Sequence, residues 1–148
     1  MSVILRRLTL ADMDAAAAVH RAAFDERLPT LAGLHTPAED RGFFRDRVFA
    51  ECDVWGGFDG DRLAGFIAFR QGWIDQFYIL PGDQRRGLGV SLLAQAKAAW
   101  PDLMLWTFQR NAGARAFYER QDFAAVEFTD GATNEERDPD VRYHWRRA

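Results

Sequence analysis

Cysteine is almost absent from this sequence, which contains only Cys52 among 148 residues. One cysteine excludes an internal disulfide framework and is typical of a protein in a reducing cytoplasm. Long hydrophobic runs are also missing. The longest alanine-rich run, 15–19, is much shorter than the roughly 20 residues of a membrane span, and the first residues lack a signal-peptide core. We therefore expect a cytoplasmic protein that has no membrane partner.

An excess of basic charge is lacking as well. The chain has 19 basic and 22 acidic residues, a net charge of −3, so no basic field favours nucleic acid as a partner. No set of cysteine, histidine and carboxylate residues has the spacing of metal ligands, and we expect no metal. The composition, 48% hydrophobic and 14% aromatic, is typical of a folded protein. The length predicts a single domain over residues 1–148.

Hydrophobic periodicity predicts the order β-α-α-β-β-β-α-β-α-β-β. Thr36-Pro37-Ala38-Glu39 is typical of a capping box that starts a helix, and 59–61 (Asp-Gly-Asp) predicts a hairpin turn. Residues 64–69 are apolar on both faces, as in a central strand. His20 falls on the apolar face of its helix and is expected to be packed there. Strands are expected at 3–8, 53–58, 62–70, 73–80, 103–108, 123–128 and 141–145.

The segment 73–90 predicts a strand, an anion-binding loop and a helix in direct succession. Backbone N–H groups at a helix start lack intrahelical partners, and the helix dipole favours a phosphate there. Gly87 and Gly89 let the backbone approach a ligand closely. The loop is neither a Walker A motif nor a complete dinucleotide fingerprint. A bare G-x-G is also typical of an ordinary strand-to-helix turn, so the spacing from Gln84 and a second motif carry the argument.

The second motif lies downstream, in residues 111–123. Together the two segments resemble the GNAT superfamily of N-acetyltransferases, which carry Q/R-x-x-G-x-G/A before one helix and an Asn-x-x-Ala-x-x-Phe-Tyr-like stretch on a later helix. The matching residues are Gln84, Gly87, Gly89, Asn111, Ala114, Phe117, Tyr118 and Phe123. Two positions depart from the family pattern: Asp122 replaces the usual glycine, and Arg85 replaces a residue that is small in many members.

The resemblance implies an α/β GNAT fold, a mixed and strongly twisted sheet of about six to seven strands with helices on both faces. It also implies acetyl-CoA as cofactor, with the pyrophosphate on the loop and the pantetheine arm along the edge of strand 77–79. Arg85 and Arg86 would add charge-assisted contacts, unless they are ordinary surface arginines. The expected cofactor-binding residues are Phe77, Tyr78, Ile79, Gln84, Arg85, Arg86, Gly87, Leu88, Gly89, Val90, Asn111 and Phe117.

Three residues are candidates for the acceptor chemistry. Tyr118 is the expected general acid, because a phenol is protonated at neutral pH and can protonate a thiolate; the alternative is a packed aromatic residue. Asp75 interrupts an apolar strand on the face of Phe77 and Ile79, which suggests a buried general base or substrate anchor, or else a salt bridge. His35, in the loop between the first two helices, is a candidate for substrate binding, or a loop histidine beside a helix cap.

These features favour an acetyl-CoA-dependent N-acetyltransferase that acts by direct transfer on a primary amine of a small molecule, peptide or protein. A non-catalytic acyl-CoA-binding sensor on the same fold is the alternative, and a nucleotide-binding module of another fold is a third reading. The loops 27–36 and 129–140 are expected to shape the acceptor pocket. The sequence leaves open the acceptor and the length of the acyl chain. A homodimer through 141–145 is a further expectation from the resemblance.

Overall fold

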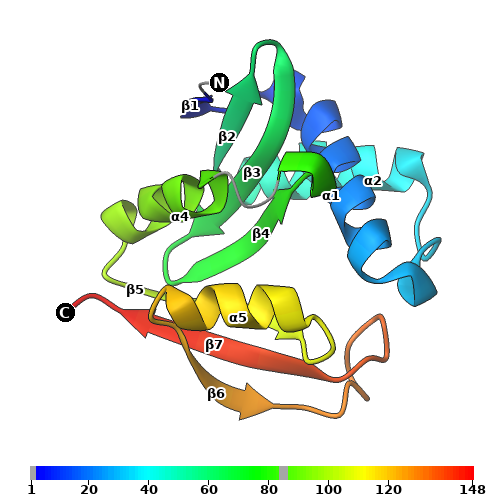
Figure 1. The fold of residues 1–148 in the computed structure, drawn as a ribbon. Coiled ribbons are helices and arrows are strands. Elements are labelled where there is room, and N and C mark those ends of the chain that lie inside the picture. The colour runs from blue at the N-terminus through cyan, green and yellow to red at the C-terminus, as the bar shows by residue number, and fades with distance from the viewer. Residues whose placement is uncertain (1–2, 84–86) are drawn as a thin grey trace.

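A single mixed sheet of seven strands organises the computed structural model, which describes residues 3–83 and 87–148 (Figure 1). In chain order the strands are β1 (Ile4–Arg7), β2 (Asp53–Asp59), β3 (Arg62–Arg70), β4 (Trp73–Ile79), β5 (Asp102–Phe108), β6 (Ala124–Phe128) and β7 (Asp140–Arg146). Across the sheet the order is β1-β2-β3-β4-β5-β7-β6. Neighbouring strands are antiparallel except β4 and β5, which are parallel. The predicted α/β architecture with a mixed sheet is confirmed.

Helices cover both faces of this sheet. They are α1 (Met13–Arg27), α2 (Pro37–Phe43), α3 (Phe49–Glu51), α4 (Leu88–Ala99) and α5 (Ala112–Arg120), with 3₁₀ turns η1 (Leu10–Asp12), η2 (Pro29–Leu31) and η4 (Pro81–Asp83) and a π-helical turn η3 (Phe44–Val48). The predicted capping box starts α2, because the Thr36 hydroxyl accepts from the Glu39 amide at 3.1 Å and the Glu39 carboxylate accepts from the Thr36 amide at 2.7 Å. Within the described residues, no helix is long and apolar enough to cross a membrane.

Two hydrophobic cores lie on opposite faces of the sheet. One packs α4 and α5 against β5 and β7, with Leu92, Leu103 and Tyr143 at its centre. The other packs α1 and η3 against β2 and β3, with Met13 and Phe66 at its centre. The interior of β3 is buried along its whole length, as its apolar sequence predicts for a central strand. The sheet therefore separates a face covered by α4 and α5 from a face covered by α1.

The turn after α5 accommodates Asp122, the departure from the family pattern. Asp122 has a φ of +71°, in the left-handed region that glycine favours. The Asp122 amide donates to the carbonyl of Glu119 at 3.2 Å, and the Phe123 amide donates to the carbonyl of Tyr118 at 3.0 Å. This pattern closes the end of α5 in the manner of a Schellman motif. Aspartate thus occupies a glycine-type position without altering the course of the turn.

Candidate functional site

Strands β4 and β5 separate after their first contact. The register pairs Trp73 with Met104 and pairs no other described residue of β4 with β5, although the two strands are neighbours in the sheet. The backbone edge of Phe77 and Tyr78 therefore faces an opening rather than a strand. A cavity of about 820 Å³ occupies this opening and extends between α1, α4 and α5.

A β-bulge in β4 changes the direction of the Asp75 side chain. Ala68 of β3 pairs with Gln76 and Phe69 pairs with Ile74, so Asp75 is an extra residue in β4. Its carboxylate accepts from Arg70 Nε at 2.7 Å and from Cys52 Sγ at 3.5 Å. The side chain is 29% exposed.

The prediction that Asp75 is a buried carboxylate on the face of Phe77 is therefore wrong. Cys52 packs with the core under α1, whereas Phe77 packs with the core under α4 and α5. Simple alternation along β4 failed because the bulge adds one residue and reverses the side-chain direction. Asp75 still lines the cavity, but it does so as the partner of Arg70.

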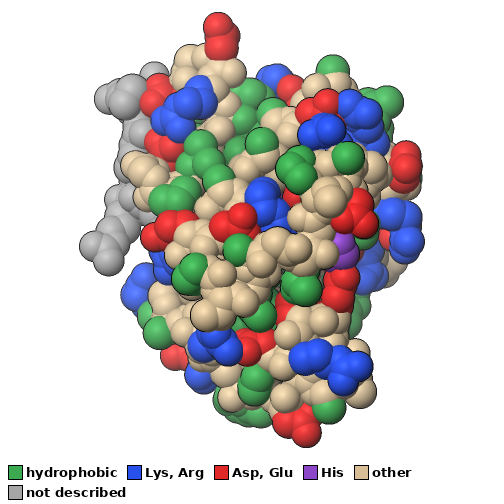
Figure 2. Space-filling model, turned by 90° about the vertical axis from the view of Figure 1, so that its right-hand side faces the viewer, with side chains coloured by type: hydrophobic (Ala, Val, Ile, Leu, Met, Phe, Trp, Pro, Cys, Tyr) green, Lys and Arg blue, Asp and Glu red, His purple; other side chains and the backbone are tan. Residues whose placement is uncertain are grey.

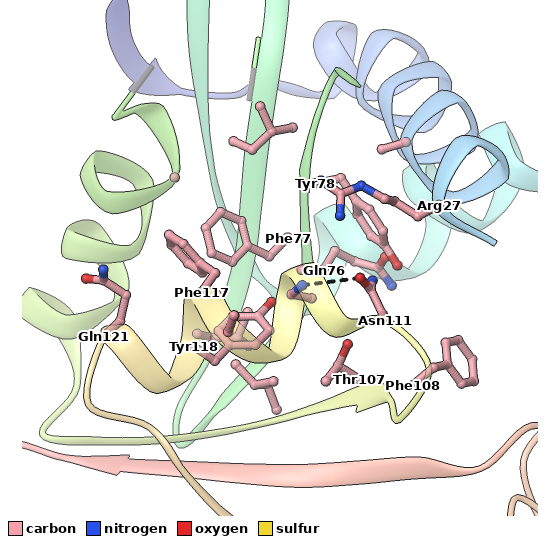
Figure 3. Close-up of a pocket in the computed structure, with 18 of the residues that line it drawn as sticks. Arg27, Gln76, Phe77, Tyr78, Thr107, Phe108, Asn111, Phe117, Tyr118 and Gln121 are labelled. Atoms are coloured by element: carbon pink, nitrogen blue, oxygen red, sulfur yellow. Dashed lines mark hydrogen bonds between the residues drawn. The ribbon is translucent and has the colours of Figure 1, made fainter. Parts of the chain in front are cut away.

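The cavity has two halves of different chemistry, because successive side chains of β4 point to opposite faces. Phe77 points toward α4 and α5, where Phe117 and Tyr118 also lie (Figure 3). Tyr78 points toward α1 and packs with the core beneath it. Several further polar and aromatic residues line the α1 end: Phe24, Arg27, Gln76, Thr107, Phe108 and Asn111. One half is thus mainly aromatic, and the other carries a cation, amides and hydroxyls.

The start of α4 forms one wall of the aromatic half. Gly87 precedes the helix with a φ of +77°, a backbone conformation that other residues rarely adopt. A Cβ atom on Gly89 would lie 3.2 Å from Cζ of Phe117, so glycine lets the Phe117 ring pack closely against the start of α4. The first N–H groups of α4 have no partner within the helix. A phosphate-bearing group with a narrow arm fits this wall.

The predicted cofactor residues fall into three groups. Those that line the cavity are Phe77, Tyr78, Ile79, Gly87, Gly89, Val90, Asn111 and Phe117. Leu88 is only 4% exposed and packs in the core, so its backbone alone is available to a ligand. Gln84, Arg85 and Arg86 lie outside the described residues.

Tyr118 lies at the centre of the aromatic half. Its ring centroid is 6.3 Å from that of Phe77, 5.6 Å from that of Phe117 and 6.0 Å from that of Tyr143. Burial raises the pKa of the Tyr118 phenol above its usual range, and the nearby Tyr78 hydroxyl raises this pKa further. The Tyr118 hydroxyl has no hydrogen-bond partner among residues 3–83 and 87–148. Tyr118 is therefore a protonated phenol that lines the cavity.

Asn111 and His35 take different positions relative to the cavity. The Asn111 side chain caps α5 by accepting from the Ala114 amide at 3.2 Å, and it also lines the cavity. His35 is not among the described residues that line the cavity. Its Nε2 lies 2.6 Å from the Glu135 carboxylate, so it joins the predicted loops 27–36 and 129–140. Arg110 joins the same loops through Thr30 and Asp138.

Sequence reasoning missed the lining contributed by α1. Arg27, at the end of α1, extends to the start of α5, where a Cβ on Gly113 would lie 2.4 Å from its Nη1. Nothing in the sequence connects these two positions. Alternation along β4 predicts that the side chains of Gln76 and Tyr78 lie on the face opposite to that of Phe77. This signal could have identified both residues as part of the lining.

Comparisons with known proteins agree with this geometry. The sequence matches the Acetyltransferase (GNAT) family over residues 15–123. It is 31% identical over 84 residues to the peptidyl-lysine N-acetyltransferase YiaC of Escherichia coli K12, a match that covers 56% of this chain and 58% of YiaC. The chain thus spans little more than half the length of this relative.

Solved structures extend the similarity of fold to the whole chain. The apo form of YjaB from Escherichia coli has a TM-score of 0.81 and 19% identity, with 100% of both chains covered. The PaiA N-acetyltransferase of Thermoplasma acidophilum, in complex with coenzyme A, has a TM-score of 0.73 and 17% identity, with 99% of each chain covered. Because the family match covers most of the sequence, this chain belongs to the acetyltransferase (GNAT) family.

Proposed function

We propose that this chain is an N-acetyltransferase that moves an acetyl group from acetyl-CoA to a primary amine by direct transfer in a ternary complex. One observation carries the proposal: the cavity between β4 and β5 has an aromatic half on the α4 and α5 side and a polar half on the α1 side. A thioester and an amine can therefore approach each other from opposite faces of the sheet. Holding two reactants in this way replaces an encounter in solution with a reaction between bound groups.

The aromatic half is proposed to bind the cofactor, which supplies an activated acetyl thioester. The N–H groups at Gly87, Leu88 and Gly89 would hold the pyrophosphate at the start of α4. The open backbone edge of β4 would pair with the amides of the pantetheine arm, much as a peptide adds to the edge of a sheet. Gly89 and Phe117 both line the cavity on the path proposed for that arm. Arg85 and Arg86 stay proposed phosphate contacts.

Tyr118 is proposed as the general acid. Its raised pKa keeps the hydroxyl proton in place at neutral pH, and that proton would pass from Oη to the departing sulfur. Asp75 is proposed as an anchor for the amine or as the acceptor of its proton through water, because it lines the cavity beside Arg70. Asn111 is proposed to contact the cofactor. His35 is proposed to bind the acceptor from the loops that surround it.

The proposed acceptor is a primary amine of a small molecule or of a peptide. YiaC, the curated relative, is named for activity on peptidyl-lysine, which supports lysine-like amines as the first compounds to test. Acidic and basic side chains are interspersed over the face that carries α1 and α2 (Figure 2). A surface of this kind does not favour a polyanionic partner.

The organisation of the protein is part of the same proposal. We propose one catalytic domain over residues 1–148, a cytoplasmic location and a homodimer. A dimer contact through the backbone edge of β7 would require rearrangement, because β7 lies between β5 and β6 in the sheet. The side chains of Phe128 and Val126 on β6, 57% and 49% exposed, offer a more accessible contact at the same end of the sheet.

Replacement of Tyr118 by phenylalanine tests the proposal. The hydroxyl has no partner among the described residues, so its loss leaves no unsatisfied group in the protein. We expect the rate of CoA release to fall by about 100-fold, while the dissociation constant for CoA, measured by calorimetry, stays within about twofold. Full activity of the variant would refute the role of Tyr118. CoA binding without transfer by the wild-type protein would instead favour the acyl-CoA sensor.

A further inference from the structure

The side chain of Tyr78 lies on the α1 side of β4, opposite to that of Phe77. Its ring is held edge-on by His20, with ring centroids 4.6 Å apart, and it lies 6.1 Å from the ring of Phe66. Contacts on both sides fix the direction of the phenol. Since Tyr78 also lines the cavity, its hydroxyl is presented to the polar half at a defined position (Figure 3).

The Tyr78 hydroxyl does not stabilise the described part of the fold through a hydrogen bond. It forms no hydrogen bond within residues 3–83 and 87–148. Burial raises the pKa of this phenol to about 12, and the negative charge of Glu136 contributes to the rise. The group is therefore neutral at physiological pH and keeps both its proton and its oxygen lone pairs. Tyr78 is partly buried and lines the cavity, so a ligand or water in the cavity can supply the hydrogen-bond partner that the described residues do not.

The two tyrosines of the cavity stand on opposite sides of the strand gap. Tyr118 reaches the cavity from α5, within the core under α4 and α5. Tyr78 reaches it from β4, beside the core under α1. Tyr118, the proposed general acid, would protonate the sulfur on one side of the gap. The phenol of Tyr78 has no assigned function and lies on the other side, from which the amine is proposed to approach.

We propose that the Tyr78 hydroxyl positions the acceptor, with Oη accepting a hydrogen bond from an N–H of the primary amine on the α1 side of the gap. This inference rests on the proposed N-acetyltransferase function. It assigns to the side chain of Tyr78 a role separate from the cofactor contacts proposed for the backbone of the same strand. Tyr78 is then a specificity-determining residue for amines that can enter the polar half and donate a hydrogen bond.

The test compares Tyr78→Phe with Tyr118→Phe, two variants that each remove one phenolic oxygen from the same cavity. Steady-state rates with acetyl-CoA and a lysine-containing peptide or a small primary amine give KM and kcat. We expect Tyr78→Phe to raise KM for the amine by about threefold to tenfold, the range for one neutral hydrogen bond. Its kcat and its dissociation constant for CoA should stay within about twofold. Tyr118→Phe should show the reverse, a lower kcat with little change in KM.

Several outcomes would overturn the inference. An unchanged KM for the amine in Tyr78→Phe, in the presence of normal wild-type activity, would refute the acceptor role alone. Weaker CoA binding by Tyr78→Phe, in place of a change in KM, would assign the hydroxyl to the cofactor and also refute it. The absence of transfer by the wild-type protein to any primary amine would overturn the proposed function and this inference together. Phenylalanine preserves the ring contacts with His20, so thermal unfolding of the variant should match that of the wild type.

Discussion

His20 should make the stability of this protein sensitive to mild acid. Its ring lies among Phe24, Phe44 and Tyr78, at centroid distances of 5.8, 5.5 and 4.6 Å. Burial, together with the positive charge of Arg21, lowers its pKa from 6.5 to about 4. Its Nδ1 atom is buried without a hydrogen-bond partner among the described residues. The folded protein therefore holds His20 in the neutral form.

The size of the effect follows from the difference in pKa. Between pH 6.5 and pH 4 the unfolded chain binds a proton at His20 that the folded chain does not bind, so stability falls as the pH falls. A shift from 6.5 to about 4 corresponds to about 3 kcal/mol at about 1.4 kcal/mol per pH unit. This contribution is present in full above pH 6.5 and is lost as the pH approaches 4. The hydrogen bond from Arg6 lowers the pKa of Asp12 from 3.8 to about 2, so the contribution of Asp12 is lost in a lower window, as the pH falls from about 3.8 to about 2.

Urea denaturation of the wild type and of His20→Phe at pH 7, 6, 5 and 4.5 measures this contribution. Phenylalanine keeps an aromatic ring at the site and cannot take up a proton. We expect the two proteins to differ little at pH 7, and the wild type to lose about 2 kcal/mol more than the variant by pH 5. If the free energies of unfolding of the two proteins change equally with pH over this range, the prediction is wrong. Such a result would show that His20 has the same pKa in the folded and unfolded chains.

Two further predictions concern glycine-type positions. Gly89→Val should weaken CoA binding by about tenfold, or about 1.4 kcal/mol, because a Cβ at this position would lie 3.2 Å from the Phe117 ring and the larger side chain would push that ring into the cavity. Calorimetric titration with CoA measures this change, and unchanged affinity would place the cofactor elsewhere. Asp122→Gly should raise the melting temperature by about 2–4 °C, since removal of the side chain relieves about 1 kcal/mol of strain at a φ of +71°. A lower melting temperature, recorded by circular dichroism, would show that contacts of the Asp122 side chain outweigh that strain.

Much of the fold was accessible from the sequence because its local signals agree with one another. The capping box at Thr36 starts α2, and the turn at Gly60 has the positive φ, +63°, that a tight hairpin requires. The apolar run of β3 identified a strand buried on both faces. These signals act within a few residues and do not depend on how distant segments pack. The strand and the helix predicted within 73–90 are present as β4 and α4 for the same reason.

The polar half of the cavity was less accessible because it depends on features that the sequence does not mark. The bulge at Asp75 arises from the pairing of β4 with β3 and reverses a direction that alternation alone predicts. The approach of Arg27 to Gly113 joins two helices through tertiary packing. Tyr78 was identified only through the backbone of β4, although its side chain lines the polar half of the cavity. Sequence periodicity describes elements, whereas a site between elements also requires their arrangement in space.

The most direct test of the proposed function is mass spectrometry of the products formed from acetyl-CoA and a panel of primary amines. The panel should include lysine-containing peptides, peptides with a free N-terminus, polyamines, amino acids and aminoglycosides, and CoA release should be recorded in parallel. If the proposed function is right, we expect an acetylated amine formed in a one-to-one ratio with free CoA. Tight CoA binding with no acetylated product across the panel would contradict the account and favour an acyl-CoA-binding sensor on the same fold.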